Sequence, residues 1–502
     1  MFKKILIANR GEIAIRVMRS CYEMGIRSVA VFSEADRTSK HVLYAHEAEC
    51  VGPANSIDSY LNIDNIIAAA KKHGVDAIHP GYGFLSENAA FAQRCAMEGI
   101  AFIGPKPETM LAMGDKIQAR RNMIAAGVPV VPGTQKRLES VEEAIEVCNE
   151  IGYPVIIKAS MGGGGKGMRV VYKPEEVAQM FAEAKSEAMS GFADDTVYIE
   201  KYIEGPHHIE IQILADNFGN VIHLCDRECS VQRRHQKIVE ESPSPFLDEA
   251  LREKMGAAAV AAAKYVGYVG AGTIEFLVDK DKNFYFLEMN TRLQVEHPVT
   301  EEVCGIDLVK QQILIAAGWP LTLEQKDVRQ RGHSIECRIC AEDTDNDFRP
   351  SPGKIKKIMM PQGQGIRVES AIYQGYDIPV YYDPMIGKLI VWATSREYAI
   401  ERMRRALYEM KVIGPVTNIN YLRRLIDVPS FKSGKYDTSF IEVNQDRLKP
   451  RKAYHNDAED MAIIAAYIDS LMDVEENVSE AEDDSALSRW RSFGLQKGVL
   501  RV

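Results

Sequence analysis

Polar side chains recur at every second position in the stretch EMNTRLQVEH, residues 288–297. The row consists of Glu288, Asn290, Arg292, Gln294 and Glu296. Side chains two positions apart lie on one face of an extended chain, so the spacing predicts a single surface of carboxylates, amides and one guanidinium. Carboxylate and amide oxygens are the ligands that hard metal ions prefer.

A second carboxylate is predicted to lie opposite Glu288. The sequence GTIEFLVDKDKNFYFLEMN can fold as a β-hairpin that turns at Asp281 and Lys282, and this register pairs Glu275 with Glu288. Side chains so paired lie roughly 5 Å apart, and two carboxylates at that spacing repel each other unless a divalent cation lies between them. Oxygen ligands beside triphosphate oxygens favour Mg²⁺ or Mn²⁺, with Asn290 as a third ligand. The alternative is that a neighbouring arginine and lysines satisfy both carboxylates.

A glycine-rich loop, ASMGGGGKGM at residues 159–168, indicates a phosphate site. Glycines allow backbone N–H groups to close on a phosphate, and Lys166 adds a positive charge. The loop is not a Walker A motif, because Gly167 follows the lysine where that motif requires Ser or Thr. Taken alone, the loop could equally be a mobile hairpin tip.

Two further lysines support the phosphate interpretation. Lys158 ends the apolar strand YPVIIK, where a buried ammonium needs a phosphate or a carboxylate. Lys116 opens a predicted helix just after Asp115. With the glycine loop and the strand YIEKYIEG, these lysines predict a nucleoside triphosphate held between two α+β lobes.

The elements that position these residues form three blocks, which together predict a mixed α/β and α+β fold. Residues 1–114 alternate apolar strands and helices, which predicts βαβ units and a parallel sheet. Residues 115–330 predict an α+β nucleotide-binding domain with a mobile lid at residues 132–203. Residues 331–446 are richer in strand signals.

Residues 447–502 form a C-terminal extension of different composition. The segment at 473–484 carries seven acidic residues and no basic ones, which is typical of a solvated linker. The final segment carries Trp490 and Phe493. We favour a docking segment for a partner subunit over a helix packed on its own domain, because a flexible linker lets aromatic anchors reach another protein.

Composition argues against several classes of protein. The 502 residues carry a formal net charge of −10, which argues against a nucleic-acid or anionic-membrane partner. No apolar run reaches about 18 residues, so no membrane span is expected, and the N-terminus lacks the pattern of a signal peptide. The first predicted strand is followed by ANRGE and not by GxGxxG, which removes most support for a nicotinamide enzyme. A cytoplasmic enzyme is expected.

The nine cysteines are scattered, which fits reduced thiols. Two spacings suggest a metal site, Cys225 with Cys229 and Cys337 with Cys340. The second pair lies in the extended run HSIECRIC, where residues three apart face opposite ways, so a structural role is favoured for both pairs. A nucleophilic role for Cys229 is also less favoured than a structural one, because no base is paired with it.

Long motifs span residues 3 to 393 and are KILIANRGEIAIRVMR, HPGYGFLSEN, GGGGKGMRVV, HHIEIQILAD, DRECSVQRRHQKIVEESP, FLEMNTRLQVEHPVTE, ECRICAED and YYDPMIGKLIVW. In these motifs the chain resembles the biotin carboxylase subunit of biotin-dependent carboxylases, in the ATP-grasp superfamily. The resemblance implies an N-terminal domain, an ATP-grasp domain and a β-rich C-terminal domain. It also implies a reaction in which ATP, bicarbonate and biotin give carboxybiotin, ADP and phosphate through carboxyphosphate.

The resemblance also implies a set of ligand-binding residues. The residues expected to bind nucleotide, bicarbonate or biotin are Lys116, Lys158, Gly163, Gly164, Gly165, Lys166, Glu200, Lys201, His208, Gln232, His235, Gln294 and Val295. The residues expected to hold two Mg²⁺ or Mn²⁺ ions are Glu275, Glu288 and Asn290.

Four residues are expected to be catalytic by the same resemblance. Arg292 and Lys237, with Gln294 and the Val295 backbone, would clamp the bicarbonate oxygens. Glu296 would accept the bicarbonate proton, and Arg338 would stabilise negative charge on the ureido oxygen of biotin.

Biotin is expected on a separate carrier protein. A biotin-accepting lysine lies in a Met-Lys-Met hairpin, whereas the nearest match here, Met410-Lys411-Val412, is predicted to end a helix. Further expectations are a homodimer within a larger complex and a carboxyltransferase subunit. The final acceptor stays open among acetyl-CoA, propionyl-CoA and pyruvate.

Two other functions remain as alternatives. One is an ATP-grasp ligase that joins an acyl phosphate to an amine, and the other is a catalytically silent scaffold.

Overall fold

The computed structural model describes residues 1–134, 138, 140–159, 168–192, 195–450, 461–462 and 464–466. The chain divides into two compact units, Met1–Leu448 and Lys449–Val502. Of the second unit, only residues 449–450, 461–462 and 464–466 are described, and the last two stretches are helical. The predicted acidic linker and the docking segment with Trp490 and Phe493 therefore lie outside the described residues. No helix among the described residues is long and apolar enough to cross a membrane.

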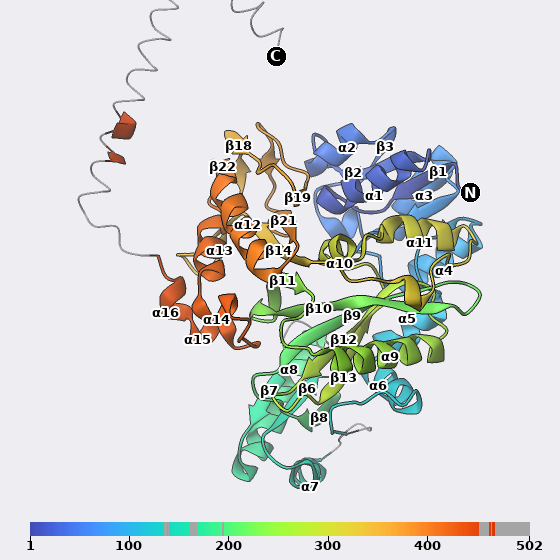
Figure 1. The fold of residues 1–502 in the computed structure, drawn as a ribbon. Coiled ribbons are helices and arrows are strands. Elements are labelled where there is room, and N and C mark those ends of the chain that lie inside the picture. The colour runs from blue at the N-terminus through green and yellow to red at the C-terminus, as the bar shows by residue number, and fades with distance from the viewer. Residues whose placement is uncertain are drawn as a thin grey trace, which may run out of the picture. The chain divides into compact units, whose positions relative to one another are not determined.

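The N-terminal part, drawn in blue in Figure 1, contains a five-stranded parallel sheet, as predicted. Its strand order is β3-β2-β1-β4-β5. Helices cover both faces: Ile5 and Ile7 pack with Ile13 of α1, whereas Leu6 packs with Ile66 of α3 and Phe91 of α4. Burial on both faces explains why these strands are almost continuously apolar. The elements are β1 (Lys4–Ile7), α1 (Gly11–Glu23), β2 (Arg27–Ser33), α2 (Lys40–Tyr44), β3 (Glu47–Gly52), α3 (Ile63–His73), β4 (Ala77–His79), α4 (Ala89–Met97), β5 (Ala101–Phe102) and α5 (Pro107–Gly114).

A small α+β subdomain, which we call the lid, carries the strands on either side of the glycine loop. Its three strands are β6 (Val155–Ala159), β7 (Met168–Val171) and β8 (Val197–Lys201), in the order β7-β6-β8. Its two helices, α7 (Val141–Ile151) and α8 (Val177–Phe192), share a hydrophobic core with this sheet. Helix α6 (Lys116–Ala125) precedes the lid. The predicted α+β flap is confirmed, but residues 160–167 lie outside the described residues.

An eight-stranded sheet, ordered β13-β12-β9-β10-β11-β14-β21-β19, forms the centre of the unit. It joins the second predicted block to the third, because β11 pairs with β14. This continuity was not predicted from the sequence. The strands are β9 (His207–Ala215), β10 (Val221–Arg233), β11 (Gln236–Ser242), β12 (Gly270–Val278), β13 (Phe284–Asn290), β14 (His333–Cys340), β19 (Ile366–Ser370) and β21 (Met385–Ala393).

Helices and short ladders complete the unit. Helix α10 packs on the sheet close to its centre. The helices are α9 (Glu249–Tyr265), α10 (His297–Cys304), α11 (Leu308–Ala316), α12 (Arg396–Glu409), α13 (Ile419–Ile426), α14 (Pro429–Lys432), α15 (Phe440–Val443) and α16 (Gln445–Leu448). The paired short strands are β15 (Glu342–Asp343) with β16 (Arg349–Pro350), β17 (Gly353–Lys354) with β20 (Asp377–Ile378), and β18 (Lys357–Met359) with β22 (Lys411–Ile413).

The position of Lys411 corrects one prediction. Helix α12 ends at Glu409, and Lys411 begins strand β22 and does not end the helix. Because the partner strand β18 lies some fifty residues earlier in the chain, Lys411 is not part of a hairpin.

Candidate active site

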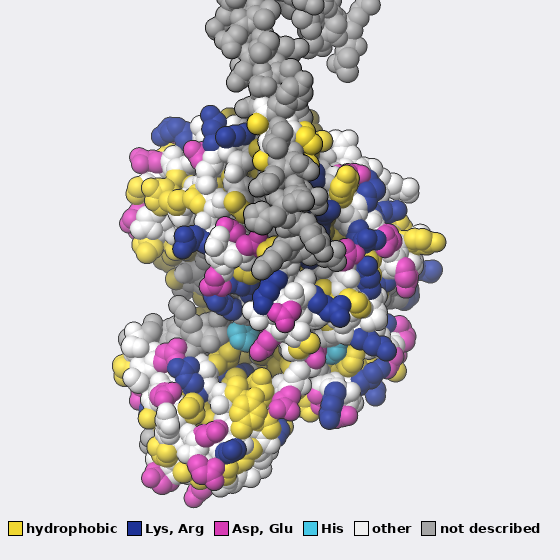
Figure 2. All heavy atoms as spheres, turned by 90° about the vertical axis from the view of Figure 1, so that its left-hand side faces the viewer, with side chains coloured by type: hydrophobic (Ala, Val, Ile, Leu, Met, Phe, Trp, Pro, Cys, Tyr) yellow, Lys and Arg dark blue, Asp and Glu magenta, His cyan; other side chains and the backbone are white. Residues whose placement is uncertain are grey.

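A cavity of about 560 Å³ lies between the lid and the central sheet. Every described residue that the sequence predicted for the site lines this cavity, except Lys201. The Lys201 ammonium instead donates to the carbonyls of Gly152 and Tyr153, at 3.0 and 2.8 Å. The predicted loop residues Gly163, Gly164, Gly165 and Lys166 lie outside the described residues. Figure 2 shows charged and histidine side chains at the edge of the hollow beside the lid.

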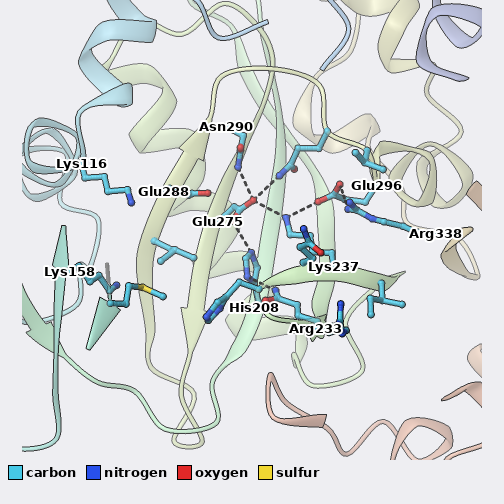
Figure 3. Close-up of a pocket in the computed structure, with 18 of the residues that line it drawn as sticks. Lys116, Lys158, His208, Arg233, Lys237, Glu275, Glu288, Asn290, Glu296 and Arg338 are labelled. Carbon is cyan, nitrogen blue, oxygen red and sulfur yellow. Dashed lines mark hydrogen bonds and ion pairs between the residues drawn. The ribbon is translucent and has the colours of Figure 1, made fainter. Parts of the chain in front are cut away.

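Two lysines stand on the lid side of the cavity, on the left of Figure 3. Lys116 is the first residue of α6, whose N-cap Asp115 accepts from the Gln118 N–H at 2.7 Å. Lys158 on β6 donates to Glu200 at 2.8 Å, and Arg120 of α6 donates to the other oxygen of that carboxylate at 2.8 Å. A helix N-terminus beside two ammonium groups forms a site for an anion. Burial lowers the pKa of Lys116, which an incoming phosphate would reverse.

The predicted carboxylate pair is confirmed at the centre of the cavity. Glu275 on β12 lies directly opposite Glu288 on β13. A register shift between Glu275 and Phe276 moves the turn, so that the Asp279 N–H donates to the Asn283 carbonyl and the loop centres on Asp281. The turn predicted at 281–282 is therefore displaced, because the bulge takes up one residue of β13.

Glu275 and Glu288 differ in their electrostatic surroundings. Glu275 accepts hydrogen bonds from Lys237 at 2.9 Å and from Asn290 and Gln294 at 2.7 Å, and His208 lies 2.8 Å from its other oxygen. Burial would raise the pKa of Glu275, but Lys237 and then His208 outweigh burial and lower it well below its usual value.

Glu288 faces the open cavity. Desolvation by the surrounding protein, and then the charge of Glu275, raise the pKa of the Glu288 carboxyl above its usual value. A divalent cation between the two carboxylates would remove this repulsion, and their oxygens are the ligands that Mg²⁺ prefers.

A third carboxylate, Glu210 on β9, extends this row and was missed from the sequence. Glu210 lies directly opposite Glu275 in the register of β9 and β12. Ligand atoms of His208, Glu210 and Glu275 lie within 4.8 Å of one another. The signal was present in HHIEIQ, because His208 and Glu210 are two apart on one strand and so share a face.

Glu296 and Arg338 meet at the opposite end of the cavity from the two lysines, on the right of Figure 3. Arg338 donates to one oxygen of Glu296 at 3.0 Å, and Lys237 donates to the other at 2.8 Å. Burial would raise the pKa of Glu296, but Lys237 outweighs burial and the pKa falls below its usual value. Glu296 is therefore an ionised carboxylate that can accept a proton.

The row of alternating residues is not one extended strand. Strand β13 ends at Asn290, and Glu296 is the N-cap of α10. Residues distant in sequence hold the turns between them. Glu87 accepts from the Arg292 guanidinium at 2.7 Å, and Lys388 donates to the Val295 carbonyl at 2.6 Å. The predicted common surface exists because all five side chains line the cavity, but the explanation from strand alternation is wrong beyond Asn290.

Arg227 on β10 was also missed, and it is fully buried behind the cavity. Its guanidinium donates to Glu210 at 2.9 Å, to Gln212 at 2.7 Å, to Thr300 of α10 at 3.0 Å and to Gln294 at 2.5 Å. This arginine therefore ties the central sheet to α10 and to the loop before it. No local sequence pattern distinguishes a buried arginine of this kind from an exposed one.

The cysteines follow the structural prediction. Cys337 packs in a hydrophobic core, whereas Cys340 lines the cavity, so the two face opposite ways on β14. Cys225 lies beside Cys304, with the sulfurs 3.3 Å apart, and not beside Cys229. Burial raises the pKa of the Cys229 thiol well above its usual value, which disfavours a nucleophilic role.

Family models match nearly the whole of this unit. The model described as "Biotin carboxylase, N-terminal domain" matches residues 1–110, "Carbamoyl-phosphate synthase L chain, ATP binding domain" matches residues 115–324, and "Biotin carboxylase C-terminal domain" matches residues 336–443.

Relatives of known name agree with these matches. Biotin carboxylase of Nostoc sp. is 57% identical over 441 residues, which are 88% of this chain and 99% of the relative. A pyruvate carboxylase subunit of Methanothermobacter thermautotrophicus is 54% identical over 442 residues, which are 88% of this chain and 90% of the relative.

Solved structures give the same result. A biotin carboxylase complex from Campylobacter jejuni has a TM-score of 0.85 at 51% identity, over 88% of this chain and 99% of that one. The biotin carboxylase domain dimer of Hydrogenobacter thermophilus 2-oxoglutarate carboxylase, in complex with MgADP, ADP and bicarbonate, has a TM-score of 0.86 at 49% identity, over 90% of this chain and 100% of that one. The chain described here belongs to the biotin carboxylase family.

Proposed function

We propose that this protein carboxylates biotin carried on a separate protein, using ATP and bicarbonate and passing through carboxyphosphate. The observation that carries the proposal is the 3.0 Å contact between Arg338 and Glu296, at the far end of a cavity that begins at Lys116 and Lys158. One end of the cavity offers cations for a triphosphate. The other end offers a base, Glu296, and a cation, Arg338, for the groups that react with the triphosphate.

The nucleotide phosphates bind on the lid side in this proposal. Lys116, Lys158 and His208 contact them, and Glu200 lies near the adenine. Gly163, Gly164, Gly165 and Lys166, which lie outside the described residues, are assigned to the phosphates by the family resemblance, and Lys201 belongs with Glu200 to the segment assigned to the adenine.

Glu275, Glu288 and Asn290 would hold Mg²⁺ or Mn²⁺, in keeping with their hard oxygen ligands and with the repulsion between the two carboxylates. A bound cation would neutralise charge on the β- and γ-phosphates.

Bicarbonate binds between Arg292, Lys237, Gln294 and the backbone of Val295. Glu296 takes the bicarbonate proton as a bicarbonate oxygen attacks the γ-phosphorus, and ADP leaves. The products of this step are carboxyphosphate and ADP. Bicarbonate itself is a poor electrophile, so the transferred phosphoryl group makes its carbon reactive.

Biotin reacts at the same end of the cavity. Carboxyphosphate releases CO₂ and phosphate beside the ureido ring, and Arg338 stabilises the negative charge that develops on the ureido oxygen. The released phosphate takes the ureido N–H proton, and the ureido nitrogen then bonds to the carbon of CO₂ to give carboxybiotin. Gln232 and His235 line the cavity on the side of the phosphates: the Gln232 amide nitrogen lies 2.9 Å from His208 Nδ1, and burial and then the charge of Lys158 lower the pKa of His235.

The partners follow from the reaction. A biotin carrier protein delivers the ring, and a carboxyltransferase subunit uses the product. Two relatives support this assembly: one is named as part of a pyruvate carboxylase and another is a domain dimer. We place the enzyme in the cytoplasm, because all nine of its cysteines are free.

The test is ATP hydrolysis by the purified chain with Mg²⁺, with and without bicarbonate and free biotin, in the wild type and in Glu296→Ala. ADP release should require bicarbonate, rise with biotin and collapse in the variant. Release that depends on an amine but not on biotin would instead identify another ATP-grasp ligase.

A further inference from the structure

Two glutamates face each other behind Arg338, outside the cavity lining. Glu240 on β11 lies directly opposite Glu336 on β14 in the antiparallel register, and both are 0% exposed. Cross-strand neighbours lie on the same face of a sheet with their Cβ atoms about 5 Å apart. The pair therefore repeats the arrangement of Glu275 and Glu288, but in a fully buried position.

Most of the oxygens of this pair have no hydrogen-bond partner. One oxygen of Glu240 accepts from the Arg338 Nε at 2.6 Å. The other Glu240 oxygen and both Glu336 oxygens are buried without a partner among the described residues. A buried carboxylate anion without partners is strongly disfavoured, and two such anions also repel each other.

The surrounding charges do not compensate for two anions. Arg338 is shared between Glu240 and Glu296, and Lys388 is engaged with Glu12 at 3.2 Å and with the Val295 carbonyl at 2.6 Å. The ionisable groups around the pair, on its own strands and on the elements packed against them, are Arg338, Lys237, Lys388, Glu296, Glu12, Tyr82, His297, Cys229, Cys337 and Cys340.

The thiols, Tyr82 and His297 in this set add no positive charge. Burial lowers the pKa of His297 well below its usual value and raises that of Tyr82, so both are neutral near pH 7. Four carboxylates, those of Glu240, Glu336, Glu296 and Glu12, are therefore surrounded by only three cations in this set, which are Arg338, Lys237 and Lys388. Consistent with this, burial raises the pKa of Glu336 well above its usual value and that of Glu240 to about 7.

We propose that Glu240 and Glu336 hold one proton between them, and that this proton keeps the positive charge of Arg338 available to the substrate. The Glu336 hydroxyl then donates to the Glu240 oxygen that has no other partner, so the two carboxyl groups share one hydrogen bond. Without the proton, Arg338 would be surrounded by three carboxylates and its field at the ureido oxygen would weaken. Glu336 is thus a positioning residue that acts through Glu240 and Arg338, and this role rests on the function proposed above.

Infrared spectroscopy tests the proton directly, without reference to activity. The wild type at neutral pH should show the C=O stretch of a protonated buried carboxylic acid, and Glu336→Gln should lack it. Glu241→Gln is the matched control: Glu241 is the neighbouring buried glutamate of β11, is paired with Arg396 and His333, and is ionised. The control should keep the band.

Activity tests the consequence for Arg338. The amide that Glu336→Gln introduces stays neutral at all pH values. The biotin-dependent rate of this variant relative to the wild type should therefore rise several-fold from neutral to alkaline pH, where the wild-type pair loses its proton. Bicarbonate-dependent ATP hydrolysis without biotin should keep a constant ratio between the two proteins.

The outcomes separate this proposal from the proposed function. A band that neither Glu336→Gln nor Glu240→Gln alters, or no band at all, overturns the shared proton even if biotin turns over normally. A rate ratio that does not change with pH overturns the link to Arg338. Absence of any biotin-dependent turnover in the wild type, with the band present, overturns the function and leaves the proton pair standing.

Discussion

Arg227 fixes the direction in which the Gln294 amide points. A guanidinium can only donate hydrogen bonds, so the amide atom 2.5 Å from it is Oε1. The Nε2 group must then point the other way, where it donates to Glu275 at 2.7 Å. Its second hydrogen is left for the cavity that Gln294 lines, which is where bicarbonate is proposed to bind.

Arg227→Lys should therefore lower kcat/KM for bicarbonate by about tenfold, the effect of losing roughly 1.4 kcal/mol of transition-state stabilisation. Lysine keeps the charge but not the forked donors, so the amide is free to rotate. The KM for ATP should not change. Arg252→Lys is the control, because Arg252 forms a similar ion pair with Asp226 at 2.6 Å outside the cavity. An equal loss in the control, or a change confined to ATP, would contradict the positioning role.

Glu296→Gln should reduce biotin carboxylation by about 10²- to 10⁴-fold, the usual contribution of a positioned base. ATP binding should persist, because Glu296 lies at the far end of the cavity from Lys116 and Lys158 (Figure 3). Steady-state kinetics with bicarbonate and biotin, together with nucleotide titration, measure both quantities. Glu302→Gln on the same helix is the control and should behave as the wild type. A raised KM for ATP with unchanged kcat would rule out the base assignment.

Arg338→Ala should separate the two halves of the reaction. Removal of a preorganised charge-stabilising donor costs about 10²- to 10³-fold, so biotin-dependent turnover should fall by this factor. Bicarbonate-dependent ATP hydrolysis without biotin should fall much less, since Arg338 acts on the ureido oxygen in the proposed mechanism. Equal losses in both assays would place Arg338 in the phosphoryl-transfer step instead.

The parts of the site that depend on local pattern could be predicted from the sequence. The pairing of Glu275 with Glu288 follows from a hairpin between adjacent strands, and it is confirmed despite the bulge. The position of Glu296 could not be predicted in the same way, because the path of residues 291–296 depends on Glu87 and Lys388, which are distant in sequence. Contacts between residues so far apart produce no periodic pattern in the sequence.

The same limit applies to the fold. Alternating strands and helices predicted the N-terminal parallel sheet, whose pairings lie between neighbouring βαβ units. The joining of β11 to β14 was not predicted, since the two strands are about ninety residues apart and no local pattern links them. Glu240 and Glu336 become neighbours only through that pairing.

Removal of divalent cations should remove most of the stabilisation of the protein by ATP. With Mg²⁺, ATP at 100 times its Kd should stabilise the folded state by about 2.7 kcal/mol, and a chelator should remove most of this effect. Glu288→Gln should raise the Mg²⁺ concentration needed for half-maximal stabilisation by ATP, because it replaces an anionic ligand with a neutral one. Thermal unfolding with ATP across a Mg²⁺ titration measures this. Unchanged Mg²⁺ dependence in Glu288→Gln would show that the cation does not lie between the two carboxylates.

The Glu241 carboxylate should make the stability of the C-terminal helices fall as the pH is lowered through the acidic range. Burial would raise the pKa of Glu241, but Arg396 and then His333 outweigh burial and lower it to about 2. A lowered carboxyl pKa contributes stability that is present above the unfolded value of about 4.3 and is lost as the pH falls toward 2. At about 1.4 kcal/mol per pKa unit, the contribution is on the order of 3 kcal/mol.

The unfolding midpoint of Glu241→Gln should therefore lie below that of the wild type near neutral pH, and the two should converge as the pH falls below about 4. Glu249→Gln is the control, because Glu249 is an exposed carboxylate that pairs with Arg252. It should shift the midpoint little at any pH, since exposed ion pairs contribute little. A constant difference between Glu241→Gln and the wild type across this range would mean that packing of the side chain, and not its charge, holds Arg396 and His333 in place.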